Sequence, residues 1–243
     1  MAKKKANNNP FEEDAGLGFE NVEQTDLGIP FLNIAQALSP EVDDESAKYI
    51  EGCKAGMIFN SLTRQILGGR GEPVEFVPCS FNKAWVEWQP REQGGGFVQQ
   101  HKTPDILHQC ERNERNQDIL ENGNLIVTTA YIGGLVVDGD ETSPAVISFT
   151  STQLKKARQW LSVMSSLKLD GSKGKFTPPM FSHKYSLSTV PEENANGKWY
   201  GWKIDLEGLL ENPNLIEAGR AASKSAKLLT AGPSTESVDG APF

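Results

Sequence analysis

An acidic run, Asp138-Gly-Asp-Glu, is the stretch whose residue types come nearest to a divalent-metal site. A calcium loop closes on a glutamate at its last ligand position. Counted from Asp138, that position holds Phe149, which cannot bind a cation. An Asp-Gly pair between two apolar runs is typical of a hairpin turn, and we favour this interpretation. A metal-dependent nuclease that uses Asp138, Asp140 and Glu141 stays an alternative, which magnesium-dependent cleavage would reveal.

Two histidines and a cysteine, His101, His108 and Cys110, have the types of zinc ligands. Structural zinc sites usually present paired ligands such as Cys-x-x-Cys, and no fourth partner is defined, so a metal at these residues stays open. The glycine-rich run 67–72 lacks the Gly-Lys-Ser/Thr of a phosphate loop, and the sequence contains neither Gly-x-Ser-x-Gly nor His-Glu-x-x-His. We therefore predict a protein that is not an enzyme and that uses no cofactor.

Tryptophans alternate with lysines in two predicted strands, 82–90 and 199–206. Successive side chains of a strand point to opposite faces, so Trp88 and Trp202 are expected in the core. The opposite face carries rings among lysines, on which the bases of a single strand can stack for about 1–3 kcal/mol each. The alternative is that the terminal arm or the C-terminal helix covers Trp85 and Trp199. The expected exposed residues are Lys83, Trp85, Trp199 and Lys203.

The segment between residues 153 and 184 contains seven basic residues and a single acidic one, Asp170. We call these seven residues the basic cluster. The net charge of −8 argues at first against nucleic acid, but acidic residues concentrate before residue 57. The asymmetry therefore favours phosphate contacts in the cluster, while a solvated helix face is the alternative for each lysine taken singly. The cluster consists of Lys155, Lys156, Arg158, Lys168, Lys173, Lys175 and Lys184.

The segments that must position these residues are mostly strands. Runs rich in β-branched and aromatic residues are bounded by Gly, Asn or Pro, and residues 91–123 are expected to form a long loop. Thr150 and Gln153 form a predicted capping box, followed by a buried stripe at Leu154, Ala157, Leu161 and Met164. The predicted strands are 55–60, 72–80, 82–90, 124–141 and 144–150, with a final hairpin over 180–206.

This order of elements matches an OB-type barrel, whose helix lies between its third and fourth strands. A β-sandwich or a mixed α+β sheet would give a similar string. We predict a mainly β fold with α: an OB-like antiparallel barrel, a helix before the last hairpin, a C-terminal helix and a disordered tail. The predicted divisions are a flexible arm (1–18), the OB-like single-stranded DNA-binding domain (19–210), the C-terminal helix (211–229) and a disordered partner-binding tail (230–243).

The expected compartment is the cytoplasm. Three widely spaced cysteines suggest reduced thiols rather than a disulfide framework. The lysines of the start have no apolar region behind them, so a secretory signal is not expected. No apolar stretch approaches the ~20 residues of a membrane helix, and no membrane partner is predicted.

The last residues, Asp239-Gly-Ala-Pro-Phe243, resemble the ending of bacterial single-stranded DNA-binding proteins, whose acidic tail closes on Asp-x-x-Pro-Phe. Some phage single-stranded DNA-binding proteins also end on acidic residues and a phenylalanine. The resemblance implies that Asp239, Pro242 and Phe243 recruit replication and repair proteins, and that the tail can compete with DNA for its groove. The scarcity of acids in the tip departs from that pattern. Runs such as "IPFLNIAQALSPE" and "STQLKKARQW" further resemble a group of tailed-phage proteins, some labelled single-stranded DNA-binding, over residues 27–205.

The sequence therefore predicts a non-catalytic single-stranded DNA-binding protein of a phage, working in the host cytoplasm. It would coat exposed strands in replication or recombination and bind replication or repair proteins through its tip, with a homo-oligomer left open. Alternatives are a strand-annealing or recombination mediator, and an adaptor that binds an enzyme and no DNA. Quenching of tryptophan fluorescence by single-stranded but not duplex oligonucleotides would separate the coating protein and the mediator, which both bind DNA, from the adaptor.

Overall fold

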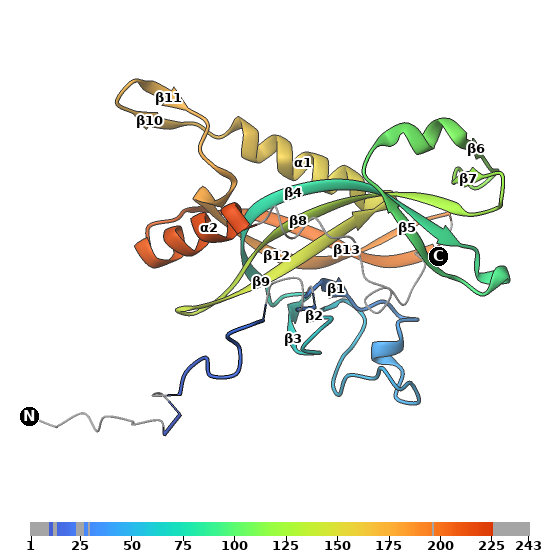
Figure 1. The fold of residues 1–243 in the computed structure, drawn as a ribbon, viewed down its shortest axis with the longest axis horizontal. Helices are drawn as coiled ribbons and strands as arrows, with labels where there is room; N and C mark the ends of the chain where they lie inside the picture. The colour runs from blue at the N-terminus through green and yellow to red at the C-terminus, as the bar shows by residue number, and fades with distance from the viewer. Residues whose placement is uncertain (1–9, 12–13, 23–26, 29, 196, 226–243) are drawn as a thin grey trace, which may run out of the picture.

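A curled antiparallel sheet of eight strands is the centre of the fold (Figure 1). The computed structural model describes residues 10–11, 14–22, 27–28, 30–195 and 197–225. The strand order is β13-β12-β4-β8-β7-β6, with β5 added to β4 and β9 to β8. The strands are β4 (Val74–Gln89), β5 (Gly96–His101), β6 (Cys110–Arg112), β7 (Asp118–Leu120), β8 (Leu125–Asp138), β9 (Glu141–Thr150), β12 (His183–Asn194) and β13 (Gly197–Leu209).

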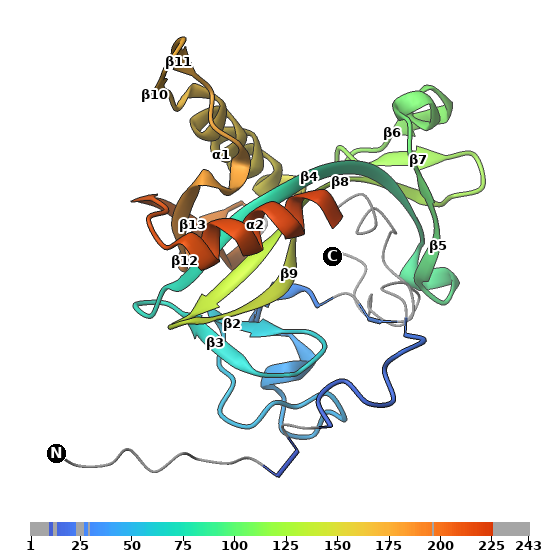
Figure 2. The ribbon, with the colours of Figure 1, turned by 60° about the vertical axis from the view of Figure 1, so that its left-hand side comes forward.

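Strand β4 changes neighbours along its length, and this produces the curl. Its first residues pair with β12 and its last residues with β5, while β8 accompanies it throughout. The register shifts between Pro78 and Ser80, and a bulge of this kind bends a strand and increases its twist. A Cβ at Gly134 of β8 would lie 2.2 Å from the Val77 carbonyl oxygen, so only glycine fits there. The sheet is an antiparallel half-barrel, and the mainly β fold with α is confirmed (Figure 2).

The helices cover opposite faces of β4. Helix α1 (Leu154–Ser166) packs on the face of Phe76, and α2 (Pro213–Ser225) packs on the face of Val77 and Cys79. The predicted stripe of α1 is confirmed, and Trp160 joins it as the largest side chain of the helix in the core. The Trp160 ring lies 5.3 Å from that of Tyr185 and 6.0 Å from that of Phe76.

A second, small sheet closes one end of the core. It consists of β1 (Leu32–Ile34), β2 (Met57–Asn60) and β3 (Ile66–Gly69), all antiparallel. Phe31 bridges to Val146 of β9, which joins the two sheets. A 3-10 turn, η2 (Pro40–Val42), lies in the connection that follows β1. Ala35, Ile50 and Phe59 form a separate hydrophobic cluster, against which Val42 of η2 packs.

The predicted capping box is wrong. A 3-10 turn, η5 (Ser151–Gln153), precedes α1, and neither Thr150 nor Gln153 caps it with its side chain. The Gln153 amide instead accepts a hydrogen bond from the Trp202 backbone N–H at 3.1 Å, on the outer edge of β13. Lys156 donates to the Trp202 carbonyl, and Gln36 binds both backbone groups of Tyr200. These side chains satisfy part of an edge that would otherwise attract another strand.

The prediction of a long loop over residues 91–123 is wrong. This segment contains η3 (Arg91–Gln93), β5, η4 (Pro104–Gln109), β6 and β7, and it folds against β4 and β8. Residues 169–176, which follow α1, form the hairpin of β10 (Leu169–Gly171) and β11 (Gly174–Phe176). A last 3-10 turn, η6 (Met180–Ser182), leads into β12.

The predicted C-terminal helix is present as α2, which begins at Pro213. The Asn212 side chain accepts a hydrogen bond from the Asn214 backbone N–H at 2.9 Å, and Pro213 opens the helix. The tail 230–243 lies outside the described residues, as does part of the arm 1–18.

Candidate nucleic-acid interface

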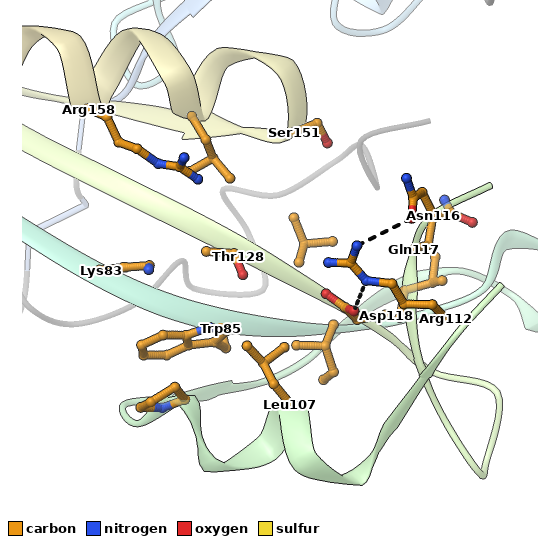
Figure 3. A pocket seen from close by; sticks show the side chains of 15 residues that line it. Lys83, Trp85, Leu107, Arg112, Asn116, Gln117, Asp118, Thr128, Ser151 and Arg158 are labelled. Atoms are coloured by element: carbon orange, nitrogen blue, oxygen red, sulfur yellow. Dashed lines mark hydrogen bonds and ion pairs between the residues drawn. The ribbon is translucent and has the colours of Figure 1, made fainter. Parts of the chain in front are cut away.

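A groove of about 450 Å³ lies between the start of α1, the strands β4 and β8, and the η4–β7 segment (Figure 3). It brings together three predicted binding residues: Lys83 and Trp85, which are close in the sequence, and Arg158, which is distant from both. Strand β4 supplies the first two and α1 supplies the third. The groove is also lined by Leu107, Arg112, Asn116, Gln117, Asp118, Leu125 and Thr128.

The two ends of the groove differ in charge. At one end, neither Lys83 nor Arg158 pairs with a carboxylate of the described residues, and the Lys83 Nζ lies 5.2 Å from the Trp85 ring centroid. At the other end, Arg112 Nε donates to Asp118 Oδ1 at 3.1 Å, which neutralises both side chains (Figure 3). The Lys83–Arg158 end therefore has a net positive charge that suits a phosphate.

The predicted exposure of Trp85 is wrong. Its side chain is only 7% exposed and packs with Ile106 of η4 and Ile126 of β8. The segment expected as a loop covers this face of β4, so both faces of the strand are buried here. The Trp85 Nε1 is buried and has no hydrogen-bond partner among the described residues. Trp85 thus forms a wall of the groove and offers no free face for stacking. Trp88 and Trp202 are each 5% exposed, which confirms their prediction as core residues.

Lys156, Lys184, Trp199 and Lys203 do not enter this groove, and acids engage each of them. Lys184 pairs with Glu75 at 2.7 Å and Lys203 with Asp205 at 2.6 Å. Exposed ion pairs contribute little stability, but a paired lysine has less charge to offer a phosphate.

Both Lys156 and Trp199 bind the same carboxylate, that of Glu192. The half-buried Trp199 donates its indole N–H to Glu192 Oε2 at 2.8 Å, and Lys156 forms an ion pair with the same side chain. Burial raises the pKa of Glu192, but the hydrogen bonds from Lys156, Gln153 and Trp199 outweigh it and hold the pKa below its usual value. The predicted stacking face of Trp199 is therefore part of a polar cluster.

The remaining lysines lie along α1 and beyond its end. Lys155 shares the exposed face of Arg158, three residues away. Lys168, Lys173 and Lys175 are exposed on or beside the β10–β11 hairpin, which projects from the far end of α1 (Figures 1 and 2). With 13 residues, α1 is about 20 Å long. The predicted basic cluster is thus divided between the groove, the helix surface and the hairpin.

The acidic run 138–141 forms the tight turn between β8 and β9, and Asp138 pairs with Glu141 in register, as the hairpin interpretation predicts. His101 Nε2 lies 2.8 Å from Glu87 Oε2, while the Cys110 thiol donates to the Ile106 carbonyl. Burial raises the pKa of that thiol. Within the described ranges, no three side chains of the His, Cys, Asp or Glu types are arranged to hold a metal ion.

Sequence reasoning missed a buried carboxylate, Glu87, near the groove. It is 4% exposed and receives hydrogen bonds from Asn124 at 2.6 Å and Gln99 at 3.0 Å, besides its contact with His101. Burial raises the pKa of Glu87, but these hydrogen bonds outweigh it and lower the pKa overall. The cluster ties β5 and the start of β8 to β4, and so fixes the strands that form the floor of the groove.

The family model described as Pam3 phage gp34-like protein matches residues 3–231, so the chain belongs to this family. This membership supports a phage origin. A search of curated proteins and a search of solved structures each found no match. In the part of the chain that the structure describes, no helix has the length and apolar character needed to cross a membrane.

Proposed function

We propose that this member of the Pam3 phage gp34-like family is a non-catalytic single-stranded DNA-binding protein that coats exposed strands in phage replication or recombination. The observation that carries the proposal is a pair of cations, Lys83 and Arg158, that have no acidic partner among the described residues and lie at one end of a groove in a half-barrel sheet. Phosphates supply most of the affinity of such proteins, and unpaired cations bind them without breaking an existing ion pair. The host cytoplasm is the proposed compartment.

Single strands suit this groove better than a duplex. Its volume of about 450 Å³ is that of a small-molecule pocket, whereas a duplex presents a broad convex surface. Amide, hydroxyl and guanidinium groups also line it, and these can bond to base edges that a duplex hides. A strand that leaves the groove along Lys155 would reach the lysines of the β10–β11 hairpin.

An oligonucleotide titration at several salt concentrations tests this function. Each neutralised phosphate contributes about −0.7 to the slope of log K against log salt. Lys83 and Arg158 alone would give about −1.4, and contacts at the hairpin would make the slope steeper. Fluorescence anisotropy of labelled single strands, with the matching duplex as a control, measures both affinity and slope. A slope near zero, or equal affinity for the duplex, would contradict the proposal.

We also propose that the tip recruits replication or repair proteins. Phe243 can fill an apolar pocket of a partner, for about 1.5–3 kcal/mol. Deleting Pro242 and Phe243 should abolish capture of these proteins and leave single-strand affinity equal or slightly higher. Capture from infected-cell extract and an oligonucleotide titration measure the two effects. A truncated protein that retains its partners would rule the tip out, and capture without any DNA binding would favour the adaptor.

A further inference from the structure

The end of the groove opposite Lys83 and Arg158 has an ordered set of hydrogen-bonding groups. Asn116 uses its amide oxygen to accept from Arg112 Nη1 at 3.3 Å, and Gln117 uses its own to accept from Asn113 Nδ2 at 2.8 Å. The amide N–H groups of Asn116 and Gln117 donate to no described residue, so they can bind a ligand. These bonds also fix which way the two amides point.

One further donor and one acceptor complete this set. Arg112 uses Nε and Nη1 toward Asp118 and Asn116, so its Nη2 group has no partner among the described residues. Asp118 uses Oδ1, so Oδ2 is its available acceptor atom. This end of the groove thus presents more donors than acceptors, and the apolar side chains of Leu107 and Leu125 also line the groove.

The bases differ in how well they complement such a set. On its pairing edge, thymine presents two carbonyl acceptors flanking one N–H donor, and cytosine likewise presents two acceptors and one donor. Guanine presents more donors than acceptors, and adenine presents one of each. A site with an excess of N–H donors around a single carboxylate oxygen therefore satisfies a pyrimidine best, because an unmatched polar group is costly once it is buried.

Resting on the proposed single-stranded DNA binding, we infer that the Arg112–Asp118 end of the groove holds one base and favours pyrimidines. The phosphate of the same nucleotide or its neighbour lies at Lys83 and Arg158, and Leu107 and Leu125 contact the ring. The protein is then a strand-binding protein with a base preference. One hydrogen bond gained by a pyrimidine corresponds to about a tenfold difference in affinity.

The test compares oligo(dT), oligo(dC) and oligo(dA) of equal length, in the wild-type protein and in the variants Asn116→Asp and Gln117→Glu, singly and together. These substitutions remove the amide donors but keep the oxygens that bind Arg112 and Asn113. Aspartate also tolerates the positive φ of 64° at position 116. Gln109→Glu adds the same charge at an exposed amide of η4 outside this groove, and serves as the control.

We expect the wild-type protein to bind both pyrimidine oligomers about tenfold more tightly than oligo(dA). The double variant should bring this ratio close to one, whereas Gln109→Glu should weaken all oligomers equally and keep the ratio. A wild-type ratio near one contradicts the inference. A ratio that persists in the double variant also contradicts it, because the preference would then come from the stacking of oligo(dA) itself. Absence of binding to every oligomer would instead refute the proposed function.

Discussion

Replacing Trp160 by alanine should lower the free energy of unfolding by about 3–5 kcal/mol, the usual cost of truncating a buried tryptophan. The side chain is 3% exposed and contacts the rings of Phe76, Phe149 and Tyr185, which belong to three different strands. Its removal leaves a cavity where α1 meets the sheet. Urea unfolding followed by circular dichroism measures the loss without depending on tryptophan fluorescence.

Two further variants separate packing from other causes. Trp160→Phe keeps most of the apolar ring that packs in the core, so the loss should be clearly smaller. Gln159→Ala, an exposed change on the same helix, should alter stability by less than about 0.5 kcal/mol. A loss below about 1 kcal/mol for Trp160→Ala would show that α1 does not anchor the core.

The position of Trp160 could have been predicted from the sequence. It falls three residues after Ala157 and four before Met164, on the stripe that helical periodicity assigns to the core. The periodicity of two in β12 and β13 likewise predicted a long hairpin and buried Trp202. Patterns of this kind are local, and long elements repeat them often enough to be recognised.

The burial of Trp85 could not have been predicted in the same way. It depends on the segment 91–123, whose strands β6 and β7 have three residues each, too few to show an alternation. Its contacts from η4 are Ile106 and the neighbouring Leu107, a single apolar pair in a polar sequence. Alternation along β4 indicates two faces, but it does not indicate that a distant segment covers the second one.

Which lysines form ion pairs with acids is a second property that the local sequence does not show. Lys184 binds Glu75, which lies 109 positions away, and Lys156 of α1 binds Glu192 of β12. A count of basic residues over 153–184 gave these lysines the same weight as Arg158. The fold separates them, because strand pairing places acids beside some lysines and none of the described acids beside Lys83 or Arg158.

This separation leads to the prediction with the largest expected effect on binding. Reversing Lys83 and Arg158 together to glutamate should weaken single-strand affinity by about a hundredfold or more at low salt, because two charge-assisted phosphate contacts are lost and repulsion replaces them. Both side chains are exposed, so the fold should be retained. Anisotropy titrations measure the affinity, and the salt dependence should flatten in the same variant.

The matched control reverses Lys184 and Lys203 to glutamate, which changes the net charge by the same amount at two lysines that already pair with Glu75 and Asp205. If long-range charge alone governed binding, both double variants would lose affinity alike. If the groove binds the strand, the control should stay within a few-fold of the wild-type protein, since its lysines do not line the groove. Equal losses in the two variants would therefore remove the groove as the binding site, because the effect of a local contact depends on where the charge lies.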